Sequence, residues 1–108
     1  MNKKKILICD DDEGILDMLE LILEDTGHQI IAEKDSLKVK TILEDQNPDL
    51  IVLDLWMPVL SGDQVLRSLR AKEATKNLPV IVISASRDGQ EIAFDAGATD
   101  FYSKAFQS

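Results

Sequence analysis

The stretch Leu50-Ile-Val-Leu-Asp54 decides how this chain folds. Four apolar residues, two of them β-branched, run directly into a carboxylate. Such a run predicts a strand that is buried on both faces, as in a parallel sheet. A carboxylate at the end of that strand lies at the rim of the sheet, where open α/β folds bind their ligands. We therefore take Asp54 as the candidate reactive group.

Two further apolar runs have the same form. Residues 6–9 read Ile-Leu-Ile-Cys and end in the acidic pair Asp10 and Asp11, and residues 80–83 read Val-Ile-Val-Ile and end in Ser84. Each run is bounded by polar or turn-forming residues, which is typical of a buried strand rather than a helix. The sequence thus predicts three central strands, each followed by a polar side chain.

Weaker strand patterns and helical spacing of apolar residues fill the rest of the chain. They predict strands at 29–32 and, at an edge, 100–103, and helices at 12–26, 36–46, 63–74 and 88–96. Ser36 is expected to cap the second helix, and Asp88-Gly-Gln-Glu91 to open the fourth as a variant capping box.

The alternation of strands and helices predicts right-handed crossovers and a mainly parallel sheet. Five strands suit an α/β, flavodoxin-like, doubly wound sheet of order 2-1-3-4-5, in which ligands bind where the first and third strands diverge. We predict one domain over residues 1–108.

Composition narrows the class of protein. Acidic residues number 20 against 12 basic ones, a net charge of −8, which disfavours binding of nucleic acid or anionic membrane by the whole surface. The single cysteine, Cys9, excludes an internal disulfide and is expected to be a buried small hydrophobe. We find no signal peptide and no run of membrane-spanning length, and we expect a cytoplasmic domain.

The polar residues at the strand ends form one constellation in the predicted sheet. Asp10, Asp11 and Asp54 would repel one another at this rim, and a hard cation such as Mg²⁺ would resolve that repulsion. Lys104, which follows the last strand, suits a phosphoryl oxygen, and Ser84 offers a hydroxyl donor to the same group. A carboxylate nucleophile, a metal, a lysine and a hydroxyl are the parts of phosphoryl transfer onto aspartate.

On these residues the chain resembles the receiver domains of the response regulators of two-component signalling. The resemblance covers essentially the whole chain, and its strength lies in several modest motifs that occur together in register. The matching features are the pair Asp10-Asp11, Asp54 within LDLWMPVLSG (53–62), Ser84 followed by Ala85, the segment 96–101, and Lys104.

The resemblance implies a phosphorylation switch. Asp54 would accept a phosphoryl group from a sensor histidine kinase, a phosphotransfer protein or a small phosphodonor. Asp10, Asp11 and Asp54, with the main-chain carbonyl of Trp56, would hold Mg²⁺. The protein would not be an enzyme beyond phosphorylating itself from small donors and losing that phosphate.

The remaining residues would carry the signal. Lys104 would pair with the acceptor carboxylate and then with the phosphoryl group, Ser84 would swing toward the phosphate, and Phe101 would turn inward with it. Bulky Trp56 would limit access of water and slow hydrolysis. Output is expected through contact with a downstream protein rather than with nucleic acid.

Three features depart from the family pattern. Ala105 stands where the family has a proline in a cis peptide, so the sequence does not fix the direction in which the Lys104 side chain points. The stretch 84–104 is about two residues shorter than usual. The fifth helix of the family is expected to be missing, which would expose apolar surface near Ile6, Phe101 and Phe106 and favour a homodimer or a partner on that face.

Other functions remain as alternatives. A degenerate receiver would act as a constitutive protein-binding module without phosphotransfer. A haloacid-dehalogenase-type phosphatase is disfavoured because Trp56 stands where that family needs a second aspartate. A flavin-binding flavodoxin is disfavoured because the acidic loop 10–13 would repel a phosphate.

Overall fold

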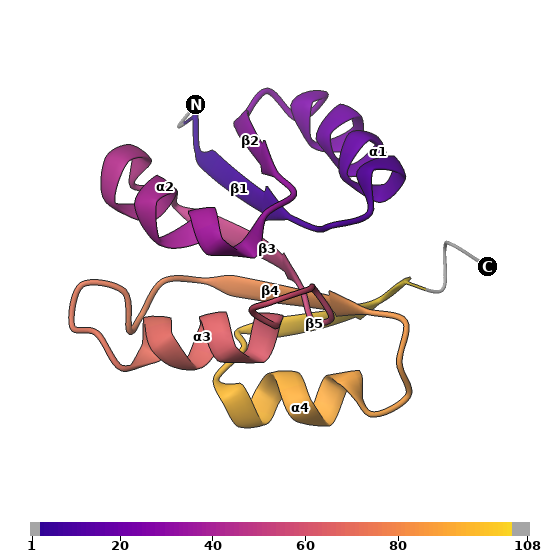
Figure 1. The fold of residues 1–108 in the computed structure, drawn as a ribbon. Coiled ribbons are helices and arrows are strands. Elements are labelled where there is room, and N and C mark those ends of the chain that lie inside the picture. The colour runs from indigo at the N-terminus through magenta and orange to yellow at the C-terminus, as the bar shows by residue number, and fades with distance from the viewer. Residues whose placement is uncertain (1–2, 105–108) are drawn as a thin grey trace.

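Five parallel strands form the sheet that the alternating sequence predicts (Figure 1). The structure is a computed structural model that describes residues 3–104. The sheet has the order β2-β1-β3-β4-β5, so the predicted fold class and strand order are confirmed. The strands are β1 (Lys5–Cys9), β2 (Gln29–Glu33), β3 (Leu50–Asp54), β4 (Val80–Ser84) and β5 (Asp100–Ser103).

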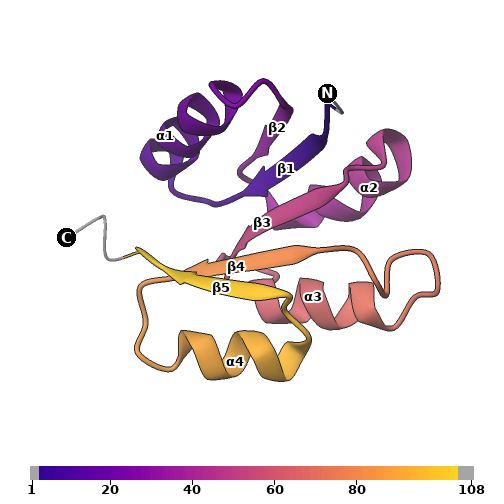
Figure 2. The ribbon, with the colours of Figure 1, turned by 180° about the vertical axis from the view of Figure 1, so that it is seen from behind.

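Helices cover the two faces of the sheet unequally. Within the described residues there are four α-helices: α1 (Glu13–Glu24), α2 (Val39–Gln46), α3 (Gly62–Arg70) and α4 (Gly89–Ala96). α1 lies on one face, and α2, α3 and α4 lie on the other (Figures 1 and 2). None of the helices in residues 3–104 is long and apolar enough to cross a membrane.

The strands are apolar on both sides because each face of the sheet carries its own core. Successive side chains of a strand point to opposite faces, so alternate residues divide between the two clusters. Under α1, the strand residues of the smaller cluster are Ile6, Ile8, Val52 and Ile83. Under α2, α3 and α4, those of the larger cluster are Leu7, Cys9, Ile51, Leu53, Val80 and Val82.

The second helix begins later than predicted, and the proposed cap at Ser36 is wrong. The Asp35 carboxylate accepts the Leu37 N–H at 2.9 Å and opens a 3₁₀ turn, η1 (Ser36–Lys38), ahead of α2. The Ser36 hydroxyl instead points inward and donates to the Pro58 carbonyl at 3.4 Å. An aspartate caps as well as a serine does, and here it stands one residue earlier.

The predicted capping box at Asp88 is also wrong, because its side chain makes no capping hydrogen bond. The chain instead uses this device at α3, where Gln64 Oε1 accepts the Ser61 N–H at 3.0 Å. This bond satisfies one free donor at the helix start and fixes the loop that leaves β3.

α3 ends at Arg70, four residues before the predicted end, because the Arg70 side chain binds the following loop. Its guanidinium donates to the carbonyls of Thr75 and Lys76 at 3.2 Å and to that of Gly97 at 2.8 Å. Gly97 caps α4 in the left-handed region, with φ of 104°. One side chain therefore joins the ends of α3 and α4.

The apolar side chains near the expected place of a fifth helix differ in their exposure. Ile6 is only 5% exposed, because Leu19 and Leu23 of α1 belong to the cluster that covers it, so the predicted exposure of Ile6 is wrong. Phe101 is half-buried against the larger core, whereas the side chain of the next residue, Tyr102, is exposed. Ala105 and Phe106 lie outside the described residues, and self-association through this face stays a prediction.

Gly62 allows α3 to begin directly against the strand that carries Asp54. The Gly62 N–H donates to the Leu55 carbonyl at 2.7 Å. A β-carbon at Gly62 would overlap the Asp54 carbonyl oxygen and lie 2.8 Å from Leu55 Cα. Both obstacles are backbone atoms, so any side chain here would push the loop away from the end of β3.

Replacing Gly62 by alanine is therefore expected to lower the free energy of unfolding by at least about 2 kcal/mol. Gly14→Ala, in the first turn of α1, is the matched control, because its β-carbon meets only the Asp12 side chain, at 3.3 Å. That change should be neutral or stabilising by up to about 1 kcal/mol, since alanine favours helix. Urea denaturation of both variants measures the difference, and equal effects would contradict this account.

Candidate functional site

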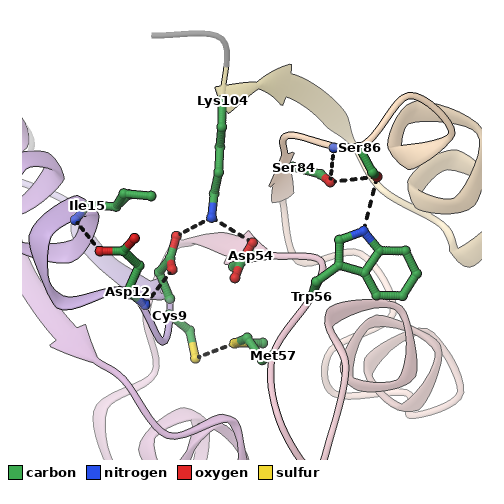
Figure 3. Close-up of polar contacts among 10 residues, drawn as sticks. Cys9, Asp12, Ile15, Asp54, Trp56, Met57, Ser84, Ser86 and Lys104 are labelled. Atoms are coloured by element: carbon green, nitrogen blue, oxygen red, sulfur yellow. Dashed lines mark hydrogen bonds and ion pairs between the residues drawn. The ribbon is translucent and has the colours of Figure 1, made fainter. Parts of the chain in front are cut away.

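The Lys104 ammonium group lies between two buried carboxylates at the carboxyl edge of the sheet (Figure 3). Its Nζ is 2.9 Å from Asp10 Oδ2, just after β1, and 2.9 Å from Asp54 Oδ1, at the end of β3. All three side chains are less than 10% exposed. The strands are parallel, so their carboxyl ends meet at this edge and bring together residues far apart in sequence.

Three carboxylates lie together at this edge of the sheet. One oxygen from each of Asp10, Asp11 and Asp54 lies within 4.8 Å of the others, and Asp11 faces solvent. Asp10 Oδ1 accepts the Asp12 N–H at 2.9 Å. Asp10 Oδ2 has no hydrogen bond of good geometry within residues 3–104, and its charge is met by Lys104. An all-oxygen set with one solvent-facing member suits a hard divalent cation that keeps some water.

The cluster strongly perturbs the Asp54 carboxyl group. The pKa of Asp54 is raised from 3.8 to about 7, chiefly by burial and in part by the negative charge of Asp10. The hydrogen bond from Lys104 opposes both effects. Burial lowers the pKa of Lys104, but the two carboxylates raise it by more, so the lysine stays charged. The ionised state of Asp54 therefore needs more positive charge than Lys104 alone provides.

The predicted serine lies at the same edge, but its hydroxyl is bonded elsewhere. Ser84 Oγ lies 2.9 Å from Ser86 Oγ and accepts the Ser86 N–H at 3.1 Å. The Trp56 indole N–H donates to Ser86 Oγ at 3.0 Å (Figure 3). Ser86 was not among the predicted site residues. The available signal was its spacing, two residues after Ser84, as Trp56 is two residues after Asp54.

The other predicted residues divide between core and rim. Asp12 Oδ1 accepts the N–H groups of Gly14 and Ile15 and caps α1. Cys9 is fully buried with Sγ 3.6 Å from Met57 Sδ, which confirms its role as a small hydrophobe. Burial, with nearby carboxylates, raises the pKa of its thiol to about 12, so the thiolate does not form near neutral pH.

Phe101 does not join the carboxylate cluster. It lies in β5 with its ring half-buried against the larger core, three residues before Lys104. Its proposed role in switching stays a prediction.

Comparison with known proteins agrees with this geometry. Residues 6–108 match the family model described as the response regulator receiver domain. The transcriptional regulator RpaA of Synechocystis, described as DNA-binding, is 36% identical over 104 residues, which cover 94% of this chain and 43% of RpaA. The chain thus spans less than half the length of this relative.

Solved structures agree as well. The receiver domain of NtrX from Brucella abortus is 31% identical with a TM-score of 0.85, over 94% of this chain and 86% of that one. The receiver domain of the sensor histidine kinase PA1611 from Pseudomonas aeruginosa, described with a magnesium ion in its active-site cleft, is 27% identical. Its TM-score is 0.87, over 97% of this chain and 88% of that one.

The chain belongs to the response regulator receiver domains, the phosphoacceptor modules of two-component signalling. Bound Mg²⁺ and phosphoaspartate are general features of this family, whose members are signalling domains rather than conventional enzymes.

Asp54→Asn is expected to stabilise the fold in the presence of chelator. The folded-state pKa of about 7 lies above the ordinary 3.8, so the stability of the wild type falls as pH rises between these values. Asparagine removes that loss, and we expect about 1–3 kcal/mol of added stability above pH 7, shrinking toward pH 4.

Denaturation curves across this pH range measure the effect. Asp17→Asn, at an exposed position of α1, is the control and should change stability little at any pH. An Asp54→Asn variant less stable than wild type above pH 7 would show that the carboxylate cluster does not strain the fold.

Proposed function

We propose that Asp54 is the phosphoacceptor of a two-component phosphorelay. The observation that carries this proposal is the buried Asp54 carboxylate, which shares one buried ammonium group with Asp10. We further propose that Asp10, Asp11 and Asp54, with the Trp56 carbonyl, hold Mg²⁺, which would neutralise the excess negative charge of the cluster and of the incoming group. The description of the PA1611 receiver supports this choice of ion.

Phosphoryl transfer onto Asp54 would take place in one displacement at phosphorus. A carboxylate oxygen of Asp54 attacks phosphorus and forms an O–P bond, while the P–N bond of a phosphohistidine or the P–O bond of acetyl phosphate breaks. The leaving imidazole or acetate takes the electron pair of that bond. Lys104 holds Asp54 in place before attack and pairs with a phosphoryl oxygen afterwards, while the added charge of Mg²⁺ would favour the ionised form of the nucleophile.

The new charge is the signal. We propose that Ser84 and Phe101 rearrange when Asp54 carries the phosphoryl group, which alters contacts with a downstream protein. The donor would be a sensor histidine kinase or a phosphotransfer protein in the cytoplasm. RpaA is described as DNA-binding, but the net charge of −8 leads us to expect no nucleic-acid contact by these 108 residues themselves.

Incubation with acetyl phosphate and Mg²⁺ is expected to add the mass of one phosphoryl group to the intact protein. Excess chelator should abolish the gain, and so should Asp54→Ala. Asp17→Ala removes an exposed carboxylate from α1 and should leave the gain unchanged. Intact-mass spectrometry reads all four samples.

The alternative function predicts another pattern. A degenerate receiver that acts as a constitutive binding module would gain no mass under any of these conditions. A gain that persists in Asp54→Ala would place the phosphoryl group on another residue and overturn the assignment of Asp54.

Trp56→Asn is expected to shorten the lifetime of the phosphorylated protein several-fold. The Trp56 ring is half-exposed and bonded toward the loop after β4, and we propose that it limits access of water to the site from there. Ser86→Ala is the matched comparison, because it removes the hydrogen bond and leaves the ring in place. Loss of phosphate measured over time should be fastest in Trp56→Asn, and equal rates in the two variants would contradict exclusion of water by the ring.

A further inference from the structure

A chain of hydrogen bonds links the loop after β3 to the loop after β4. Its first bond runs from the Trp56 indole N–H to Ser86 Oγ, at 3.0 Å, and its second joins Ser86 Oγ and Ser84 Oγ, at 2.9 Å (Figure 3). The Ser86 N–H also donates to Ser84 Oγ at 3.1 Å. These contacts lie beside the carboxylate cluster but use none of its atoms.

The directions of these bonds follow from the chemistry of the groups. An indole N–H only donates, so Ser86 Oγ is an acceptor in the first bond. Ser84 is 1% exposed, and within residues 3–104 the only acceptor bonded to its hydroxyl is Ser86 Oγ. A buried donor without an acceptor is costly, so the Ser84 proton goes to Ser86 rather than to Asp54.

The serine pair also sits tightly against the first residue of α4. A β-carbon at Gly89 would lie 2.9 Å from both Cβ and Oγ of Ser84 and 3.1 Å from Ser86 Oγ. The Gly89 N–H donates to the Ser86 carbonyl at 3.3 Å. The arrangement of the two hydroxyls is therefore coupled by direct packing to the start of α4.

We propose that Trp56 and Ser86 form a latch that holds the Ser84 hydroxyl away from the phosphoryl site, with Ser86 as a positioning residue. This inference rests on the proposed function, in which Ser84 donates to the phosphoryl group. One hydroxyl proton cannot serve both acceptors, so the bond from Ser84 to Ser86 breaks when the phosphoryl group is bound. The latch thus opposes loading of Asp54 and sets the threshold of the switch.

The first test detects the latch in the free protein. Trp56 is the only tryptophan, so the protein gives one indole N–H signal in a nitrogen-15 NMR spectrum. Ser86→Ala should shift this signal and speed its exchange with water several-fold. Ser68→Ala, at an exposed position of α3, is the matched control and should change neither. An indole signal that is insensitive to Ser86→Ala would overturn the latch.

The second test measures what the latch does. With Mg²⁺ present, beryllofluoride serves as the phosphoryl analogue, and calorimetry gives its Kd. Ser86→Ala should bind it about fivefold more tightly, the size expected for the Ser84–Ser86 hydrogen bond. Trp56→Phe should tighten binding by a smaller factor, because it keeps that bond and only frees Ser86 from the indole. The double variant should bind no more tightly than Ser86→Ala, because Trp56 acts on Ser84 only through the Ser86 hydroxyl. Unchanged or weaker binding, or effects that multiply, would overturn the proposal.

The outcomes separate this inference from the proposed function. A wild type that gains a phosphoryl group, with variants that bind the analogue no more tightly, would defeat the latch alone. A wild type that gains no phosphoryl group and binds no analogue would defeat both, since the latch then has nothing to oppose. Thermal denaturation of each variant shows that it is folded before its binding is compared.

Discussion

The ammonium group of Lys104 between Asp10 and Asp54 is the contact on which the rest of the structure depends. A buried ammonium group without any partner would be strongly destabilising, so Lys104 requires at least one of these two carboxylates. The three side chains come from the ends of β1 and β3 and from the residue after β5, so the same contact ties both halves of the sheet together at its functional edge. The acidic excess that remains is what makes this edge receptive to a cation and a phosphoryl group.

Much of the fold can be predicted from local patterns in the sequence. Three apolar runs that end in polar side chains gave the central strands, and the alternation with helices gave the strand order. The errors arose where contacts between distant residues decide. Arg70 ends α3 by binding carbonyls as far away as Gly97, and α1 covers Ile6. Neither effect follows from local spacing, since both need the chain to be folded.

The site divides in the same way. Its charged residues could be predicted because parallel strands place their carboxyl ends at one edge, whatever the loops do. Ser86 could not, because its role depends on how two loops lie relative to each other. A serine in a loop is ordinary in sequence, and only the indole of Trp56 at 3.0 Å gives it a part in the site. The sequence therefore predicts the charged residues that react, but not the hydrogen bonds between loops that position Ser84.

The hydrogen bond from Arg70 to the Gly97 carbonyl decides how α4 can move. The C-terminal end of α4 is hydrogen-bonded to α3 through Arg70. Its N-terminal end, at Gly89, packs against Ser84 and Ser86. A displacement at Gly89 would therefore be expected to tilt the helix, which is about 12 Å long, about the end held at Gly97. The displacement of α4 would then be largest at Gly89, beside the site, and smallest at Gly97.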